Sequence, residues 1–442
     1  MEILLSDLCQ EIGKGEASRI RRLDDRLAIL GTQAHFSSGV KAHLLGKATR
    51  DAHPEAVALL LDPRLHRNPA AIRGRYPLWT AVASLSPLVV AAYPAPMTAP
   101  PVHDQLGRPL GVLRLSLTAR CNLACPYCRP DGQEPAGLLN LQQRLAVISA
   151  AVGLGATSLR LTGGEPLLNP GLEALIAAVQ PLRERGLRDI ALTSNGTLLT
   201  AERARGLRAA GLDRLTLSLD GSDGASVTRM AGLADAAAGE QALQRVLAAI
   251  EHARSAGFDP ARGALKLNAV IERCRNDDQL LPLAALARAR GLELRLIEVM
   301  DVGTRNGWRP ESVLPASAMV ATIAARWPLE PLGRAAHGTA SRWRYRDGGG
   351  QLAVVASVSA PFCGDCNRLR VTADGLAYTC LFADPSTGLD LKPWLQEHSD
   401  PGELRQALVQ LWHQRGDRYS EERHSRRRDA APHHAEMAYL GG

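Results

Sequence analysis

Residues 120–128 read RCNLACPYC, in which Cys121, Cys125 and Cys128 have the spacing C-x3-C-x2-C. Iron–sulfur clusters are held by cysteine thiolates, so three thiolates can ligate three irons of a four-iron cluster. The fourth iron then stays open to a substrate or cofactor. Structural zinc sites usually pair two C-x2-C knuckles into four ligands, and this spacing does not fit that pattern.

A second group of three cysteines lies far downstream, where Cys363, Cys366 and Cys380 have the spacing C-x2-C-x13-C. Six of the eight cysteines therefore fall into two trios, and each trio is one ligand short of a closed site. Cys9 and Cys274 have no partner spacing and are predicted to be ordinary residues.

Short apolar strands alternate with helical stretches from about residue 111 onward. The predicted strands are 112–117, 159–162, 190–193, 215–219, 265–271 and 292–299, and the predicted helices are 141–153, 172–185, 201–210, 241–256 and 280–289. This alternation is typical of parallel βα units, and six of them predict an α/β fold, a partial (β/α)6 barrel of the TIM type. Active sites of such folds lie at the carboxyl ends of the strands, which is where the first trio falls.

The chain is predicted to have three parts. Residues 1–100 form an N-terminal extension of unknown role, and the proline-rich stretch 94–101 predicts a linker after it. Residues 101–305 form the barrel domain. Residues 306–442 form a C-terminal α+β domain with the second trio, in which Gly348-Gly349-Gly350 predicts a hairpin turn between strands 343–346 and 352–355.

The bulk composition excludes several classes of protein. The 442 residues are 45% hydrophobic and 22% charged, and the most apolar run, 77–97, is broken by Ser84, Ser86 and Pro87. We therefore expect no membrane span and no signal peptide, and clustered cysteines indicate a reducing cytoplasm. The net charge of +7 suits a small anionic substrate. Basic residues near the C-terminus have no interleaved aromatics, so they predict a solvated segment rather than a nucleic-acid site; they are Arg423, Arg426, Arg427 and Arg428.

The second predicted strand is followed by Gly163-Gly164-Glu165-Pro166. The two glycines would let the backbone approach a ligand closely, and Glu165 could accept hydrogen bonds from an ammonium group. Beside a cluster with an open iron, this pair of features suits an amino-acid-like ligand whose amine and carboxylate chelate that iron.

These motifs together resemble a known superfamily and, within it, one family. The first trio and the GGEP run resemble the radical S-adenosylmethionine superfamily. The segment from residue 297 onward resembles the GTP 3′,8-cyclase family of molybdenum cofactor biosynthesis, and the whole likeness runs from about residue 103 to 442. Its motifs are IEVMDVG at 297–303, NGW at 306–308, PFCGDCNRLRV at 361–371, TADG at 372–375, CLF at 380–382 and GG at 441–442.

The resemblance implies an activity and its cofactors. Two [4Fe-4S] clusters and S-adenosylmethionine would convert GTP to (8S)-3′,8-cyclo-7,8-dihydroguanosine 5′-triphosphate, the first step of the pathway. The first cluster would cleave S-adenosylmethionine, and the second would bind the guanine base. Implied partners are an electron donor of the flavodoxin or ferredoxin type, a downstream cyclic pyranopterin monophosphate synthase and a second copy of the chain in a homodimer.

The resemblance also assigns residues. Contacts to S-adenosylmethionine would come from Tyr127, Gly164, Glu165, Ser218 and Met300. Contacts to GTP would come from Arg114, Arg160, Thr193, Lys266, Arg295, Arg368, Leu369 and Arg370. A charge in an apolar strand is costly unless it is paired, so the basic residues that interrupt the predicted strands favour an anion site on their own account. Arg368 and Arg370, with the tail Gly441-Gly442, would serve catalysis, because the tail is predicted to order the arginines that bind GTP.

Two positions depart from the family pattern, and other functions stay open. Ser158 stands where the family often has lysine, and Ala119 stands where it often has aspartate. Alternatives are a peptide-modifying radical S-adenosylmethionine enzyme, a zinc-binding module built on the second trio and a histidine, and an inactive paralogue.

Overall fold

The structure, a computed structural model, describes residues 102–128, 130, 132–426 and 434–441. The chain divides into two units, one of residues 1–98 with 173–185 and one of residues 99–172 with 186–442. The described residues of the first unit lie in α9 (Leu172–Ala178) and the 3-10 segment η3 (Gln180–Arg185). The second unit carries both cysteine trios.

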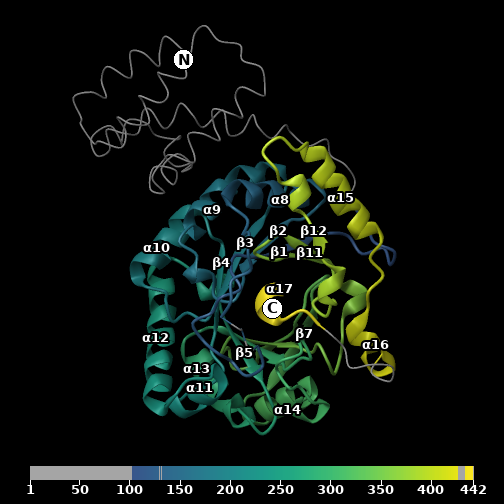
Figure 1. Cartoon of the computed structure of the whole chain (residues 1–442). Coiled ribbons are helices and arrows are strands. Elements are labelled where there is room, and N and C mark those ends of the chain that lie inside the picture. The colour runs from purple at the N-terminus through teal and green to yellow at the C-terminus, as the bar shows by residue number, and fades with distance from the viewer. Residues whose placement is uncertain (1–101, 129, 131, 427–433, 442) are drawn as a thin grey trace, which may run out of the picture. The chain divides into compact units, whose positions relative to one another are not determined.

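The six predicted strands are present and form consecutive parallel neighbours in one sheet, which confirms the predicted α/β barrel architecture. They are β1 (Val112–Ser116), β2 (Ser158–Thr162), β3 (Asp189–Ser194), β4 (Arg214–Ser218), β5 (Leu265–Ile271) and β6 (Glu293–Glu298). Figure 1 shows helices along the outer side of these strands. Those of the second unit are α8 (Leu141–Gly153), α10 (Ala201–Ala210), α11 (Gly224–Ala231), α12 (Ala236–Ser255) and α13 (Leu280–Ala289).

Local signals fix the ends of these helices. Asn140 and Gln143 form a capping box at the start of α8, and the side chain of Thr200 caps α10. Gly211 ends α10 in the left-handed region, with φ of 104°. The unpredicted helix α11 has its own cap at Asp223, and the predicted helix 172–185 ends as a 3-10 segment.

The two faces of the sheet differ in polarity. In β5, Leu265 and Leu267 are fully buried toward the helices. Lys266 and Asn268 alternate with them along the strand, lie on the inner face and are partly exposed. Sheets made only of parallel strands are usually apolar on both faces. A polar inner face therefore indicates that the interior of this barrel binds a polar ligand.

Strands from the C-terminal third extend the same sheet at both ends. Strand β9 (Gln351–Val355) pairs in parallel with β6, and β10 (Arg368–Val371) pairs in parallel with β1. Antiparallel strands continue each edge in the order β12-β11-β10 on one side and β9-β8-β7 on the other. Their bounds are β7 (Leu329–Arg334), β8 (Ser341–Tyr345), β11 (Leu376–Tyr378) and β12 (Leu389–Asp390). The predicted hairpin is confirmed, since β8 and β9 pair around Gly348–Gly350.

The remaining helices follow and flank these strands. They are α14 (Ala316–Arg326), α15 (Pro401–His413), α16 (Tyr419–Arg426) and α17 (Met437–Leu440). Because β9 and β10 lie at opposite ends of the parallel strands, residues 356–367 must cross from one end to the other, and this crossing carries Cys363 and Cys366. Figure 1 shows α17 within the ring of strands.

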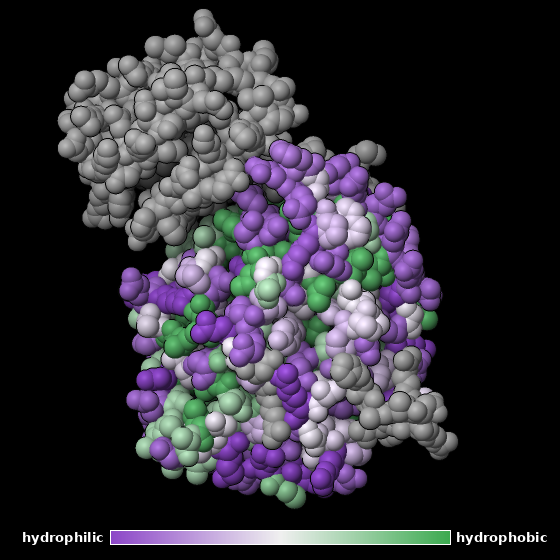
Figure 2. All heavy atoms as spheres, in the orientation of Figure 1, coloured by the Kyte–Doolittle hydropathy of each residue, from purple (hydrophilic) through white to green (hydrophobic). Residues whose placement is uncertain are grey.

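The surface of the second unit is mainly hydrophilic on the face shown in Figure 2, with hydrophobic residues scattered over it. Leu106, Leu138 and Leu168 are the large apolar side chains that are exposed among the described residues. In the described part of the chain, every helix is too short or too polar to cross a bilayer.

Candidate functional site

The loop after β2 is hydrogen-bonded to the backbone directly before the first cysteine trio. Gly164 N donates a hydrogen bond to Thr118 O (2.8 Å), and Glu165 N donates to Arg120 O (2.8 Å). A Cβ atom at Gly164 would lie 2.2 Å from Arg120 O, so only glycine permits this approach. The glycines thus let the backbone approach the cysteine loop. The prediction from the sequence was that they let it approach a ligand.

Glu165 is fully buried, and hydrogen bonds within the protein engage both of its carboxylate oxygens. Oε1 accepts from Leu167 N (2.9 Å) and Ser194 Oγ (2.8 Å), while Oε2 accepts from Asn195 N (2.7 Å). Burial raises the pKa of Glu165, although these donors oppose the shift. In this structure Glu165 orients Asn195, whose Nδ2 points at Cys121 Sγ (3.8 Å). Its contact with an ammonium group stays a prediction.

The three thiols of the first trio lie close enough to influence one another. Burial raises the pKa of Cys121 and raises that of Cys125 well above its usual range. Burial, with the neighbouring Cys121, raises the pKa of Cys128 to about 12. Buried thiolates need a compensating positive charge, and iron supplies it, so this donor set fits an iron–sulfur cluster. Among the described residues, no three cysteine, histidine or acidic side chains are close enough to hold a single metal ion.

Tyr127 connects the cysteine loop to the ends of later strands. Its Oη donates to Asp220 Oδ2 (2.6 Å), and Asp220 Oδ1 accepts from Val270 N (2.8 Å). Burial raises the pKa of Asp220 to about 6. Asn306 Nδ2 donates to Met300 O (3.1 Å) and Tyr127 O (3.4 Å), which brings Met300 to the same region. Sequence reasoning gave Asp220 no role, although an aspartate directly after a strand was a usable signal.

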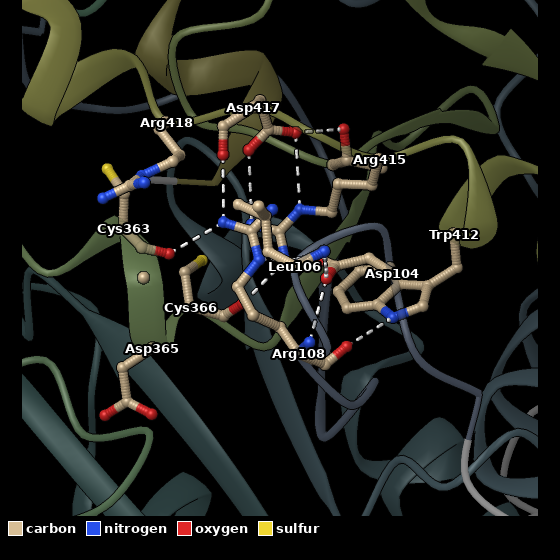
Figure 3. Close-up of polar contacts among 12 residues, drawn as sticks. Asp104, Leu106, Arg108, Cys363, Asp365, Cys366, Trp412, Arg415, Asp417 and Arg418 are labelled. Atoms are coloured by element: carbon tan, nitrogen blue, oxygen red, sulfur yellow. Dashed lines mark hydrogen bonds and ion pairs between the residues drawn. The ribbon is translucent and has the colours of Figure 1, made fainter.

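A buried ionic network holds the turn that carries Cys363 and Cys366, and Figure 3 shows its members converging on that turn. Cys363 begins the 3-10 segment η7 (Cys363–Asp365). Arg108 Nη1 donates to Cys363 O (2.7 Å), and Arg415 Nη1 donates to Cys366 O (2.6 Å). Both arginines bond Asp104, at 2.5 and 3.2 Å. Sequence analysis did not identify Arg108 or Arg415, because the cysteine carbonyls that they bond lie 255 and 49 residues away along the chain.

The thiols of the second trio have different electrostatic surroundings. Burial alone would raise the pKa of Cys366, but the cations Arg368 and Arg415 lower it to about 6. Burial and the nearby Asp417 raise the pKa of Cys380 to about 12, and burial raises that of Cys363. This trio also offers thiolates alone as its donor atoms, so it fits an iron–sulfur cluster in the same way.

The predicted GTP-binding arginines come together on the inner face of the sheet. Arg370, Arg114 and Arg160 lie side by side in register on β10, β1 and β2. Burial lowers the pKa of Arg114 well below its usual range, and the positive charges of Arg370, Arg160 and Arg368 add to the shift. Such crowding of like charges is costly, and a bound anion would relieve it.

The other predicted GTP residues lie across the barrel. Lys266 Nζ and Arg295 Nη2 each donate to Glu293 Oε1 at 2.9 Å. Thr193 is on the same face, since the register pairs it with Thr216 and Thr216 with Lys266. Leu369 differs, because its side chain is buried beside Leu113 on the outer face, which leaves only its backbone to a ligand.

Orphaned polar atoms mark the inner face near the predicted S-adenosylmethionine residues. Ser218, Asn268 and Arg295 share one register row on β4, β5 and β6. Asn268 Oδ1 and Arg295 Nε are buried and have no hydrogen-bond partner among the described residues. Buried polar atoms are normally paired, so this row fits a polar ligand such as S-adenosylmethionine.

The C-terminal tail reaches the arginine row. Gly441 O accepts from Arg114 Nε (2.9 Å) and Nη2 (2.5 Å), and Arg370 Nη1 lies 3.4 Å from it. Gly441 has φ of 64°, and a Cβ atom there would lie 2.4 Å from Thr162 Cγ2. Gly442 lies outside the described residues.

The structure also accounts for the two departures from the family pattern. Ala119 N donates to Glu134 Oε1 (2.8 Å), so Glu134 supplies a carboxylate beside the position that lacks aspartate. Ser158 Oγ donates to Asp189 Oδ2 (2.8 Å) and faces the inner side of the barrel, two residues before Arg160.

The prediction of a solvated basic segment is wrong for Arg423, which is buried. Its Nε donates to both carboxylate oxygens of Asp301, at 3.0 and 3.1 Å, and Tyr419 Oη donates to the same carboxylate (2.9 Å). Burial next to an acidic partner pairs the charge, which sequence reading alone could not foresee. Arg427 and Arg428 lie outside the described residues.

Comparisons with known proteins agree on both halves of the site. Residues 115–287 match the Radical SAM superfamily, and residues 292–421 match the family described as Molybdenum Cofactor Synthesis C. A protein of Synechococcus sp. (strain CC9902) named GTP 3′,8-cyclase is 60% identical over 340 residues, which cover 77% of this chain and 98% of that protein. One of the same name from Xanthomonas campestris pv. campestris (strain B100) is 46% identical over 78% of this chain and 99% of its own length.

A likeness to a solved structure concerns the fold alone. Streptococcus suis SuiB bound to the precursor peptide SuiA has a TM-score of 0.50 and 11% sequence identity. The match covers 83% of this chain and 81% of that one.

Proposed function

Because the chain belongs to the GTP 3′,8-cyclase family of radical S-adenosylmethionine enzymes, we propose that it converts GTP to (8S)-3′,8-cyclo-7,8-dihydroguanosine 5′-triphosphate. This is the first step of molybdenum cofactor biosynthesis. The observation that carries the proposal is the row of Arg370, Arg114 and Arg160 on the inner face of a barrel that carries two cysteine trios. A nucleoside triphosphate matches both the charge and the place of that row.

The first trio and its surroundings would hold the radical-generating group. Cys121, Cys125 and Cys128 would hold a [4Fe-4S] cluster, which with S-adenosylmethionine would supply the radical chemistry that starts at the 3′ hydrogen of GTP. Tyr127, fixed by Asp220, and Met300, fixed through Asn306, would position the S-adenosylmethionine. Gly164, Glu165 and Ser218 are proposed to complete its contacts, since they lie at the ends of β2 and β4; Glu165 acts there by ordering Asn195.

A second [4Fe-4S] cluster is proposed on Cys363, Cys366 and Cys380, with an open iron for the guanine base. Arg368, next to this trio, and Arg370, on the arginine row, link the second cluster to the triphosphate site. Gly441 O, held between Arg114 and Arg370, keeps those two side chains extended into the barrel. We infer that this arrangement places the ribose between the two clusters and excludes water from it.

The alternatives are less well supported. The likeness to SuiB is one of fold at 11% identity, so it does not favour a peptide substrate. A cationic inner face favours a small polyanion over a peptide, and two incomplete trios favour iron over a single zinc. We further propose a cytoplasmic, homodimeric enzyme that takes electrons from a flavodoxin- or ferredoxin-type donor and passes its product to cyclic pyranopterin monophosphate synthase.

Anaerobic purification and product analysis test the proposal. We expect brown protein with about eight irons per chain, and a cyclised product from GTP that depends on S-adenosylmethionine and reductant. Cys380→Ala should lose about half of the iron, whereas the control Cys274→Ala, at an exposed cysteine, should lose none. Colourless protein with one zinc, or an iron-loaded enzyme that leaves GTP unchanged, would refute the proposed function.

A further inference from the structure

Arg214 is a charged residue of the inner face that no predicted contact includes. It is the first residue of β4, and the register places Arg160, Ala191 and Arg214 in one row across β2, β3 and β4. The side chains of Arg214 and Arg160 are 30% and 29% exposed, so both remain accessible to a ligand in spite of their ion pairs. Arg214 therefore lies on the same face as the arginines proposed to bind GTP.

One carboxylate, that of Asp189 on β3, serves two arginines. Arg214 Nε donates to Asp189 Oδ1 (2.6 Å), Arg214 Nη2 bonds Oδ2, and Arg160 Nη2 lies 3.6 Å from the same Oδ2. Ser158 Oγ also donates to Oδ2 (2.8 Å). This pairing occupies one edge of the Arg214 guanidinium. In the described part of the chain, its Nη1 has no hydrogen-bond partner.

A matching triplet lies on the neighbouring strands β5 and β6, where Glu293 is shared by Lys266 and Arg295. The two triplets hold four cations and two carboxylates, which leaves an excess of two positive charges (4 − 2). The charge of Arg214 acts on a cation of each triplet, namely Arg160 in its own triplet with Asp189 and Lys266 in the triplet with Glu293. Burial and the charge of Arg214 lower the pKa of Arg160 to about 10, and Arg214 also contributes to the lowered pKa of Lys266, whose main cause is burial.

We propose that Arg214 is a further phosphate-binding residue of the GTP site, acting at the amino-terminal ends of β2, β3 and β4. The guanidinium fork bonds Asp189 with one edge and offers the other edge to the outermost phosphates. Ser158 brings no charge to this end of the barrel, because its hydroxyl is neutral, and that hydroxyl is bonded to Asp189. Arg214 supplies that charge from the neighbouring strand. This inference rests on the proposed function, since it concerns the phosphates of GTP.

Binding measurements on the full-length, cluster-loaded protein test this role. Isothermal titration calorimetry under anaerobic conditions would compare GTP, GDP, GMP and guanosine on wild type, Arg214→Gln and Arg214→Lys. Charge-assisted hydrogen bonds to phosphate predict that Arg214→Gln weakens GTP binding roughly 10- to 100-fold. The loss should shrink with each phosphate removed and fall below about threefold for guanosine. The affinity of Arg214→Lys for GTP should lie between those of wild type and Arg214→Gln, because lysine keeps the charge but lacks the guanidinium fork.

The matched control is Arg229→Gln on α11, which removes the same charge from an exposed ion pair with Asp278. It should leave every affinity unchanged. Equal weakening of GTP and guanosine by Arg214→Gln, or unchanged GTP binding, overturns the inference. If Arg214→Gln does not fold, the comparison between GTP and guanosine on Arg214→Lys decides in the same way. Wild type that neither binds nor converts GTP overturns the proposed function and this inference together; wild-type turnover with an unaffected variant overturns this inference alone.

Discussion

At the scale of single residues, Gly441 shows how one missing Cβ atom positions the tail. Its φ of 64° and its approach to Thr162 exclude a larger residue without movement of the tail. Gly441→Ala should therefore displace the carbonyl that Arg114 and Arg370 hold, at a cost of about 1–3 kcal/mol. We expect product formation to fall at least about tenfold with the iron content unchanged.

The matched control for that substitution is Gly153→Ala at the end of α8, where nothing lies within 4 Å of the added Cβ atom. Product formation would be assayed by chromatography, and iron by a colorimetric assay. Wild-type turnover in Gly441→Ala would show that the tail does not order the arginines.

Arg415 joins Cys366 of the second trio to a buried ionic network. Its guanidinium joins Cys366 O, Asp104 and Asp417, and its side chain is 1% exposed. Arg415→Lys keeps the charge but cannot make these bonds together, and breaking a buried ionic network costs about 3–5 kcal/mol. We expect loss of iron from the second trio alone, with cleavage of S-adenosylmethionine retained at the first.

Iron analysis and electron paramagnetic resonance spectra of the reduced protein would show this selective loss. The control is Arg334→Lys, at a more exposed ion pair with Asp365 on the same turn. Arg415→Lys with a full iron complement and both cluster signals would contradict the prediction.

At the scale of elements, the start of β3 is tied to its neighbours by Asp189. Burial alone would raise the pKa of Asp189, but Arg214, Arg160 and Ser158 lower it overall. A carboxylate with a lowered folded-state pKa stabilises the protein above its unfolded pKa, about 3.9, and loses that contribution as the pH falls through the folded value. The melting temperature of Asp189→Asn should therefore lie below that of wild type at pH 7.

The difference in melting temperature between wild type and Asp189→Asn should narrow as the pH falls below about 4, since wild type then loses the ion pairs of Asp189. Scanning fluorimetry measures this difference in melting temperature. The apoprotein is used because loss of the clusters in acid would otherwise contribute to the difference. Asp278→Asn, at an exposed acidic residue, should show little difference at any pH. A gap between Asp189→Asn and wild type that stays constant into acid would rule out the ion pairs as its source.

Which elements could be predicted depends on how local their cause is. The six strands and helices α8, α10 and α13 follow from hydrophobic periodicity, and α8 and α10 also from local caps, so the sequence predicts them closely. The partners of β9 and β10 depend on pairing across the whole chain, which periodicity does not encode. Residues 306–442 were expected as an α+β domain, and the structure adds that their strands extend the barrel sheet at both edges.

The same distinction holds within the site. The cysteine spacing and the charges that interrupt strands are local signals, and they predicted both trios and an anion site that includes Arg114 and Arg160. Arg370 was assigned only by the family resemblance. Arg108 and Arg415 left no local signal, because each is defined by carbonyl groups far away in the sequence. Arg423 looked like part of a basic surface run until its buried partner, Asp301, was known.

At the scale of the whole molecule, every described site residue lies in the unit of residues 99–172 and 186–442. The Synechococcus relative matches 77% of this chain but 98% of its own length, so that relative has no counterpart for a large part of the remainder. Residues 1–98 are therefore expected to be dispensable for the chemistry. A variant of residues 99–442 should keep its iron content, bind GTP and form the cyclised product at the rate of the full-length chain.

The truncated and full-length proteins should be compared with two reductants, because each reductant tests a different role of residues 1–98. With dithionite the electrons need no docking site, so equal rates for the truncated and full-length proteins would confirm that residues 1–98 take no part in binding or cyclisation. With a flavodoxin or ferredoxin as donor, a slower rate of the truncated protein alone would assign those residues to electron delivery. Loss of product with dithionite, in a truncated protein that retains its iron, would contradict the prediction, because the active site would then need residues beyond those that hold the clusters and GTP.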